Sequence, residues 1–101
     1  MSTNFDAYFP EEKEIRHLGQ RAYGWRFLHR AYPEIGIVDI ESWMAQLDRA
    51  EWIRDEYGRE YDVGEFRRAV AECQNGRPRD RYSGADWTDP EGHCFSAAEF
   101  C

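Results

Sequence analysis

The sequence has 101 residues, with 20 acidic against 13 basic side chains and a formal net charge of −7. This length fits one domain, and its 6 Phe, 6 Tyr and 4 Trp residues exclude an intrinsically disordered chain because they can fill a modest core. No stretch approaches the roughly twenty apolar residues of a membrane span, and the acidic balance disfavours nucleic acid and anionic membranes as partners. The N-terminus lacks a signal-peptide pattern, so we expect a soluble, cytoplasmic protein.

The N-terminal third predicts a loose segment followed by a hairpin. Residues 1–13 are expected to form a flexible arm, and residues 14–101 a single α+β domain. Residues 14–21 and 25–30 predict two antiparallel strands joined by a turn at Ala22-Tyr23-Gly24. Proline lacks a backbone donor, so the Tyr32-Pro33 step ends the second strand.

Two short helices are predicted from their caps and their apolar spacing. Asp39 is a good N-cap for the first helix. Its buried stripe is predicted to contain Ile40, Trp43, Met44 and Leu47. The second helix is opened by a capping box in which Asp62 is paired with Glu65, three residues on. Its stripe is predicted to contain Val63, Phe66, Val70 and Cys73.

Two further hairpins complete the predicted fold. Residues 52–61 form one, with a turn at Asp55-Glu56-Tyr57-Gly58 in which Gly58 is free to adopt a positive φ. The segment Asp89-Pro90-Glu91-Gly92 is well suited to a type I turn, with Trp87 and Phe95 on the flanking strands. The predicted order is ββ-α-ββ-α-ββ, which favours an antiparallel sheet of hairpins with the two helices packed on it.

The histidines and cysteines do not have the spacing of a metal site. Structural zinc sites draw ligands from close pairs such as Cys-x-x-Cys. The only adjacent pair here is His93-Cys94, whose side chains point to opposite faces of a strand. We therefore expect no metal and no cofactor. Reduced thiols are expected at Cys73, Cys94 and Cys101, although the spacing leaves a Cys73–Cys94 disulfide open.

No catalytic motif is recognisable. A Cys94–His pair is the nearest candidate, but its acidic neighbours Glu91 and Glu99 raise the pKa of a thiol rather than lower it. Carboxylates that lie in solvated turns do not form an acid–base pair. We therefore expect a protein that is not an enzyme, while a small enzyme with a Cys/His site stays the weakest alternative.

Two charged segments are candidate contact surfaces. The loop Arg77-Pro78-Arg79-Asp80-Arg81 is the one basic island, and it either pairs with the protein's own acids or grips a phosphate or a partner's carboxylates. We expect the first of these. The second segment is an acidic stretch whose hairpin tip presents an aromatic anchor. The predicted partner-binding residues are Glu51, Asp55, Glu56, Tyr57, Glu60, Asp62 and Glu65.

The chain resembles a group of small phage and prophage proteins of unknown function from residue 17 onward. The motifs that carry the resemblance are His17-Leu18-Gly19, Gly24-Trp25-Arg26-Phe27, Asp55-Glu56-Tyr57-Gly58-Arg59-Glu60, Asp89-Pro90-Glu91-Gly92-His93 and Ala98-Glu99-Phe100. Members of this group often carry a cysteine pair upstream of the His-Leu-Gly motif, which is missing here, so any metal role in relatives does not transfer. The resemblance implies a phage origin.

Together these features predict a protein-binding module. We expect a small acidic phage accessory protein that inhibits a host defence nucleoprotein machine, such as a CRISPR effector or a restriction enzyme. Its partner would be a host protein with a basic surface, contacted by a patch that imitates the charge of nucleic acid. We expect no direct binding of nucleic acid, and a monomer or weak dimer. The alternative is a structural or housekeeping phage protein that self-associates through exposed aromatic side chains.

Overall fold

The computed structural model describes residues 2–98 and 100, and within them it contains seven strands and two α-helices. The strands are β1 (Ser2–Phe9), β2 (Glu14–Ala22), β3 (Leu28–Arg30), β4 (Trp52–Asp55), β5 (Glu60–Tyr61), β6 (Trp87–Thr88) and β7 (Cys94–Ser96). The α-helices are α1 (Ile40–Leu47) and α2 (Val63–Cys73), and two 3-10 turns are η1 (Pro33–Ile35) and η2 (Arg81–Ser83).

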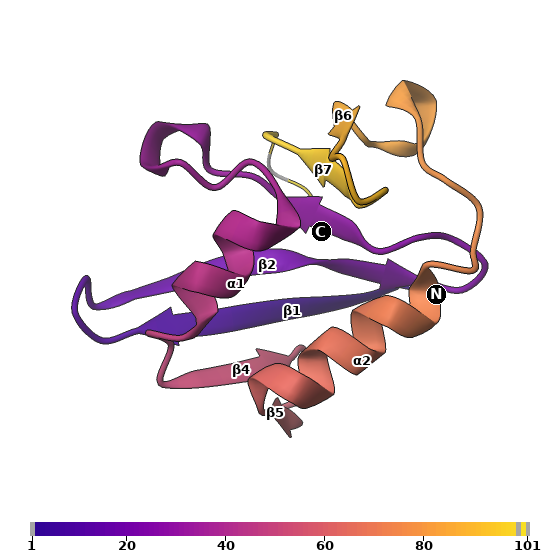
Figure 1. Ribbon diagram of the computed structural model, residues 1–101. Helices are drawn as coiled ribbons and strands as arrows, with labels where there is room; N and C mark the ends of the chain where they lie inside the picture. Colours follow the sequence, from indigo (N-terminus) through magenta and orange to yellow (C-terminus); the bar gives the residue numbers. More distant parts are fainter. Residues whose placement is uncertain (1, 99, 101) are drawn as a thin grey trace.

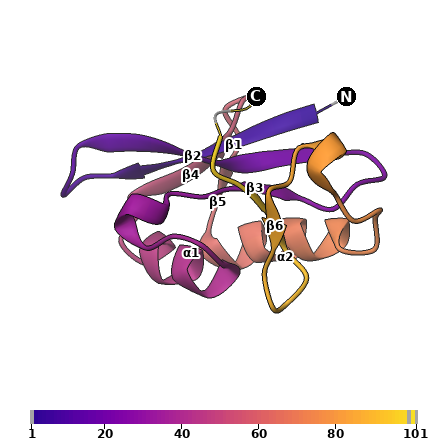
Figure 2. The same cartoon turned by 90° about the horizontal axis from the view of Figure 1, so that it is seen from above.

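The strands form one sheet in the order β5-β4-β1-β2-β3-β7-β6. Both α-helices pack on the same face of this sheet (Figures 1 and 2). The expected α+β architecture of hairpins with two helices is thus confirmed. The pairing of β3 with β7 is parallel, whereas the other pairings are antiparallel. Because β3 and β7 are far apart in sequence, no hairpin pattern could indicate this pairing.

The prediction of a flexible arm over residues 1–13 is wrong, because these residues contain β1. This strand lies in the interior of the sheet, between β2 and β4. Its side chains alternate, and Phe5, Ala7 and Phe9 are fully buried beneath the helices. The alternating residues Asn4, Asp6 and Tyr8, which lie on the other face, hide this pattern.

The hairpin of β2 and β3 forms as expected, but its second strand is shorter than predicted. The strand begins at Leu28, because the preceding segment bonds to a different part of the chain. The backbone N–H of Arg26 donates to the carbonyl of Arg77, and that of Arg77 donates to Gly24. The loop after α2 therefore pairs with residues 24–26, where the sequence predicted only a hairpin strand.

Both helices begin as predicted. The Asp39 side chain accepts from the N–H of Ser42 at 2.8 Å, and the Asp62 side chain accepts from that of Glu65 at the same distance. In each helix the third residue also accepts from the cap's N–H, which completes a capping box. The buried faces contain Ile40, Trp43 and Leu47 in α1, and Phe66, Ala69 and Val70 in α2.

The two later hairpins are also confirmed. In the first, β4 pairs with β5 and the φ of Gly58 is +87°. In the second, Trp87 lies opposite Phe95, and the N–H of Gly92 donates to the carbonyl of Asp89 to close the turn. Both hairpins could be predicted from the sequence because a β-turn is formed by four consecutive residues, whose types indicate it directly.

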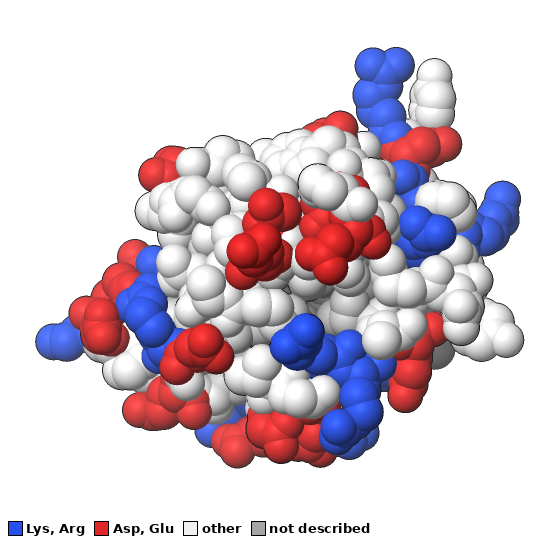
Figure 3. Space-filling model, in the orientation of Figure 1, with Lys and Arg blue, Asp and Glu red and all other residues white. Residues whose placement is uncertain are grey.

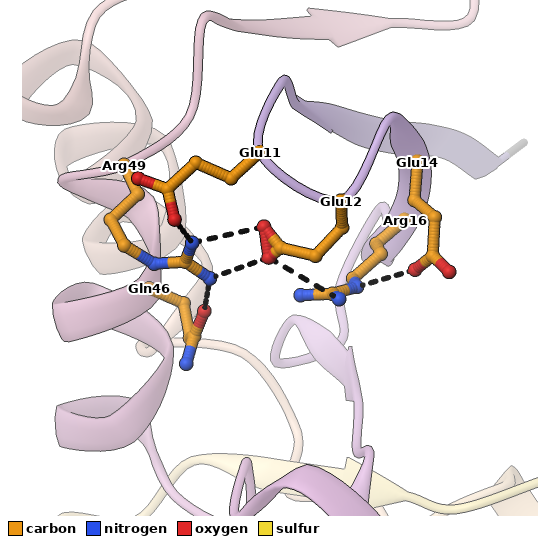
Figure 4. A network of polar contacts seen from close by, with 6 residues as sticks. All are labelled: Glu11, Glu12, Glu14, Arg16, Gln46 and Arg49. Atoms are coloured by element: carbon orange, nitrogen blue, oxygen red, sulfur yellow. Dashed lines mark hydrogen bonds and ion pairs between the residues drawn. The ribbon is translucent and has the colours of Figure 1, made fainter.

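A charged network joins the β1–β2 turn to the C-terminal end of α1 (Figure 4). The Arg49 guanidinium donates to both carboxylate oxygens of Glu12, at 2.9 and 3.0 Å, and also to Glu11 and Gln46. Arg16 lies on the other side of Glu12 at 3.8 Å. The Arg49 hydrogen bond is the main reason why the pKa of Glu12 is below its usual value. This bidentate pair holds the turn against the helix.

Candidate functional site

The seven predicted partner-binding residues are spread along the β5 edge of the sheet. Asp55, Glu56 and Tyr57 lie at or next to the β4–β5 turn and Glu60 is in β5, whereas Glu51, Asp62 and Glu65 lie toward the other end of the hairpin, before β4 and at the start of α2. Tyr57 is at the tip of the turn, and its side chain is 69% exposed. The predicted aromatic anchor is therefore accessible to a partner.

Hydrogen bonds within the chain hold this tip in place. The Asp55 carboxylate accepts from the backbone N–H groups of Tyr57 and Arg59, at 2.9 and 3.1 Å, and from the Tyr61 hydroxyl at 2.9 Å. Partial burial acts to raise the pKa of Asp55, but these hydrogen bonds outweigh it and keep that pKa below its usual value. Glu56 accepts from the N–H of Asn4 at 2.7 Å, which ties the tip to β1. The turn is thus ordered before any partner arrives.

Three of the four remaining acids are also engaged in local contacts. Glu60 pairs with Arg54 at 2.7 Å, and the Asp62 and Glu65 side chains form the capping box of α2. The guanidinium of Arg59 lies over the Tyr61 ring, within the same surface. Basic side chains therefore interrupt the acidic stretch, which weakens its likeness to the uniform negative charge of a nucleic acid.

A second surface feature, which the sequence did not indicate, is a hollow of about 720 Å³ between the helices. Its apolar floor comes from Ile40, Met44, Val70 and Ala71. Glu41 and Glu91 line one part of it, whereas Arg67 and Arg68 line another. Figure 3 shows acidic side chains above this hollow and basic ones below it. The arrangement can hold a ligand that has an apolar centre and charges of both signs.

Polar groups of the β6–β7 turn close one end of the hollow. The Gly92 carbonyl accepts from Arg26 at 3.1 Å and from Gln74 at 3.2 Å. The Gln74 side-chain oxygen and the His93 Nδ1 are buried without a partner among the described residues. These atoms come from segments far apart in the chain, so no motif marks them in the sequence.

His29 lies next to His93 but is sealed from solvent. Its side chain is 1% exposed, and the two imidazole rings are 5.4 Å apart. Burial, together with the neighbouring His93, lowers the pKa of His29 well below its usual value. His29 is therefore a neutral core residue that stacks on Phe95.

Cys94 and His93 point to opposite faces of the sheet. His93 lines the hollow on the helix side, whereas Cys94 is fully buried with Leu28 and Ala85 in a second small cluster. The thiol contacts the Arg79 carbonyl rather than an imidazole. Cys73 and Cys94 are both free thiols, so the disulfide that the spacing left open does not form, and Cys101 lies outside the described residues. Among residues 2–98 and 100, no three His, Cys, Asp or Glu side chains gather as a metal site requires.

The prediction that the basic loop of residues 77–81 pairs with the protein's own acids is wrong. In the part of the chain that the structure describes, ion pairs involve Arg16, Arg49 and Arg54 only. The arginines of residues 77–81 instead contact aromatic rings and carbonyl oxygens. The loop is held by its backbone bonds to residues 24–26, and none of its guanidinium groups forms an ion pair within the described residues.

Comparison of the chain with protein-family models, with curated proteins and with solved structures finds no match. In the described part of the chain no helix has the length and apolar character needed to cross a bilayer. The assignment of a function thus depends on the geometry of the surfaces described above.

Proposed function

We propose that this chain is a protein-binding module and that its contact surface is the β4–β5 hairpin with the start of α2. The observation that carries the proposal is the tip itself. Tyr57 is 69% exposed, on a turn that Asp55 and Glu56 hold rigid through hydrogen bonds. A large exposed aromatic side chain on an ordered support costs little entropy when it binds, which is typical of a binding hot spot.

The proposed partner is a host protein with a basic surface, and the proposed effect is inhibition of a defence nucleoprotein machine. The acidic residues support a positively charged partner surface, because exposed carboxylates attract Arg and Lys side chains and speed association. Phage origin rests on the sequence resemblance and supports the class of target. The interruptions at Arg54 and Arg59 favour a local contact around Tyr57 over broad charge mimicry.

The test is an inhibition assay with purified host machines. DNA cleavage by a CRISPR effector complex and by a restriction enzyme is measured with and without the protein. We expect inhibition of one of them, its loss in Tyr57→Ser at the tip, and a smaller decrease in Glu51→Lys, which changes an exposed side chain at the other end of β4. Asp55 is unsuitable for this test because its carboxylate supports the turn. The control is Ile15→Ser, since Ile15 is 61% exposed but lies in β2, outside the hairpin. Inhibition that survives both hairpin variants would contradict the proposed surface.

The alternative is self-association through exposed side chains. Ile15, Tyr23, Tyr57 and Tyr82 are all more than half exposed, and such residues support contact between copies. Light scattering at increasing concentration separates the two functions. A mass that stays at the monomer value excludes self-association, whereas a rising mass supports it, and its decrease in Tyr57→Ser would place Tyr57 in the contact.

A further inference from the structure

The loop after α2 presents arginines that no carboxylate neutralises in residues 2–98 and 100. Arg77 and Arg81 are exposed, and neither forms an ion pair there. The nearest acid in the loop, Asp80, is occupied by the backbone N–H groups of Tyr82 and Ser83 at 2.9 and 3.0 Å. Residues 77–81 thus contain three arginines and one ionised acid, and two of the arginines are exposed.

Aromatic rings alternate with these arginines. The guanidinium carbons of Arg77 and Arg79 lie 4.8 and 5.7 Å from the centre of the Trp25 ring. Arg81 lies 5.9 Å from the ring of Tyr82. Tyr82 is 92% exposed, and Tyr23, in the turn before Trp25, is 97% exposed. We call Tyr23, Trp25, Arg77, Arg79, Arg81 and Tyr82 the arginine–aromatic surface.

Arg79 holds the two halves of this surface together. Its Nε donates to the Arg26 carbonyl at 2.8 Å, and its Nη1 donates to the Ser83 carbonyl at 3.2 Å. Its Nη2 is buried without a partner among the described residues. A half-buried guanidinium without a counter-ion is unfavourable, and an anion placed at this surface would offset its charge.

A hollow of about 650 Å³ adjoins the surface between the β2–β3 turn and the end of α2. Tyr23, Trp25 and Arg21 line it, and Glu72 is the acid on its rim. Figure 3 shows basic side chains on the right-hand flank, where Figure 1 places the β2–β3 turn and the segment after α2. The region thus combines a recess, exposed rings and an excess of arginines (Arg21, Arg77, Arg79 and Arg81) over the acids Glu72 and Asp80.

We propose that the arginine–aromatic surface binds the phosphate and base of nucleotides, as they occur in single-stranded nucleic acid. Phosphates would pair with Arg77 and Arg81, and bases would stack on Tyr23 and Tyr82, as in sites that combine a basic groove with aromatic platforms. The net charge of −7 argued against such a ligand. At short range, however, the charges next to the surface determine whether a phosphate is attracted, because salt screens charges beyond about 10 Å.

The probe is a fluorescent thymidine oligonucleotide of about 12 residues, followed by anisotropy at about 50 mM salt and then at rising salt. We expect saturable binding whose affinity falls with salt. Removing one phosphate contact reduces the slope of log K against log salt by about 0.7. A mononucleotide and inorganic phosphate serve as competitors, and they separate a strand site from a nucleotide site of the same chemistry.

Matched variants locate the site. Arg77→Gln and Arg81→Gln each remove one exposed positive charge, and we expect each to reduce the slope. Lys13→Gln removes the same charge at the other end of β2 and is expected to change nothing. Tyr82→Ala and Tyr23→Ala are expected to weaken binding about tenfold each, since loss of one stacked base has about this effect. Glu72→Gln removes the rim acid and is expected to tighten binding.

The outcomes are distinct from those of the proposed protein-binding function, because Tyr57→Ser is expected to leave oligonucleotide binding unchanged. The proposal is overturned if no oligonucleotide binds, or if Lys13→Gln weakens binding as much as Arg77→Gln. It is also overturned if a polyglutamate peptide displaces the oligonucleotide as well as a second oligonucleotide does, since the surface would then take any polyanion, such as an acidic protein segment. Circular dichroism of each variant verifies that the fold is kept.

Discussion

Asp89 joins two segments of the backbone through one buried carboxylate. Its side chain accepts from the N–H of Glu91 at 3.0 Å, of His93 at 2.8 Å and of Ile40 at 2.8 Å, and the residue is 7% exposed. The first two bonds shape the β6–β7 turn, and the third connects that turn to the first residue of α1. The type I turn pattern predicted the local bonds, but the bond to the helix required the fold.

Asp89→Ala should be among the most damaging single changes at a polar residue. Three N–H groups lose their acceptor, one in a buried and two in partly buried hydrogen bonds, so we expect a loss of about 2–4 kcal/mol in the free energy of unfolding. Urea denaturation measures this as a lower midpoint with the slope unchanged. Asp48→Ala, at an exposed acid after α1, should stay within about 0.5 kcal/mol of wild type. Equal midpoints for the two variants would show that the carboxylate is not structural.

Neutral His29 should make stability depend on pH. Burial lowers the pKa of His29 well below 6.5 in the folded state, so only the unfolded chain takes up a proton as the pH falls through 6.5. Stability is then complete above about pH 7 and decreases toward pH 5, by at most about 1.4 kcal/mol per pH unit for this one proton.

Replacement of the imidazole tests this assignment. In His29→Phe, urea midpoints measured between pH 7.5 and pH 5 should decline less steeply than in wild type. His17→Gln should remove a smaller part of this pH dependence. His17 is only half-buried, and this burial lowers its pKa less than that of His29. An unchanged pH slope in His29→Phe would mean that another group causes the acid sensitivity.

Among the secondary-structure elements, β2 depends on one glycine for its contact with β3. A Cβ at Gly19 would lie 2.2 Å from the Leu28 carbonyl oxygen and 2.4 Å from a ring atom of Phe27. The register of β1 with β2 shifts beside this residue, between Phe5 and Asp6. The glycine of the His-Leu-Gly motif is therefore explained by the close packing of β2 on β3, which the sequence of the motif did not reveal.

Gly19→Ala and Gly24→Ala form a sharp comparison. Alanine at position 19 must push backbone aside, so we expect a loss of more than about 3 kcal/mol or no folded protein. At position 24 a Cβ meets nothing within 4 Å, and only the φ of +84° is unfavourable. The cost there should be about 1 kcal/mol. Thermal unfolding followed by circular dichroism distinguishes the two, and a mild effect at position 19 would contradict the close approach.

At the scale of the whole molecule, the decisive feature is the placement of β1 between β2 and β4. Phe5 contacts the rings of Phe27, Tyr61 and Phe66, with centroid distances of 5.3 to 5.6 Å. These rings come from three other parts of the chain, so the first strand connects the core.

Removal of residues 1–13 should therefore unfold the protein. The shortened chain loses the neighbour of two strands and the buried side chains of Phe5, Ala7 and Phe9. Burial of each large apolar side chain stabilises by about 1.5–3 kcal/mol, which together is comparable to the whole stability of a small domain. We expect no cooperative transition in urea for residues 14–101. A synthetic peptide of residues 1–13 added in excess should restore part of it, whereas a cooperative transition without the peptide would support a dispensable arm.

The sequence by itself determined the features that arise within a few residues. The caps at Asp39 and Asp62 and the turns at Gly58 and Gly92 depend on bonds between positions two to four apart. Their residue types therefore identify them without knowledge of the fold. The α+β class follows from these elements, and so does the exposed tip at Tyr57.

Only the tertiary structure decided what depends on residues distant in the chain. The interior place of β1, the parallel pairing of β3 with β7 and the hollow between the helices are of this kind. The tertiary structure also decided which charged side chains have partners. The acidic residues around Asp55 accept hydrogen bonds from nearby donors, whereas Arg77 and Arg81 are exposed. The physical reason is that backbone pairing and side-chain contacts between remote segments are set by packing of the core, and that packing has no local signature in the sequence.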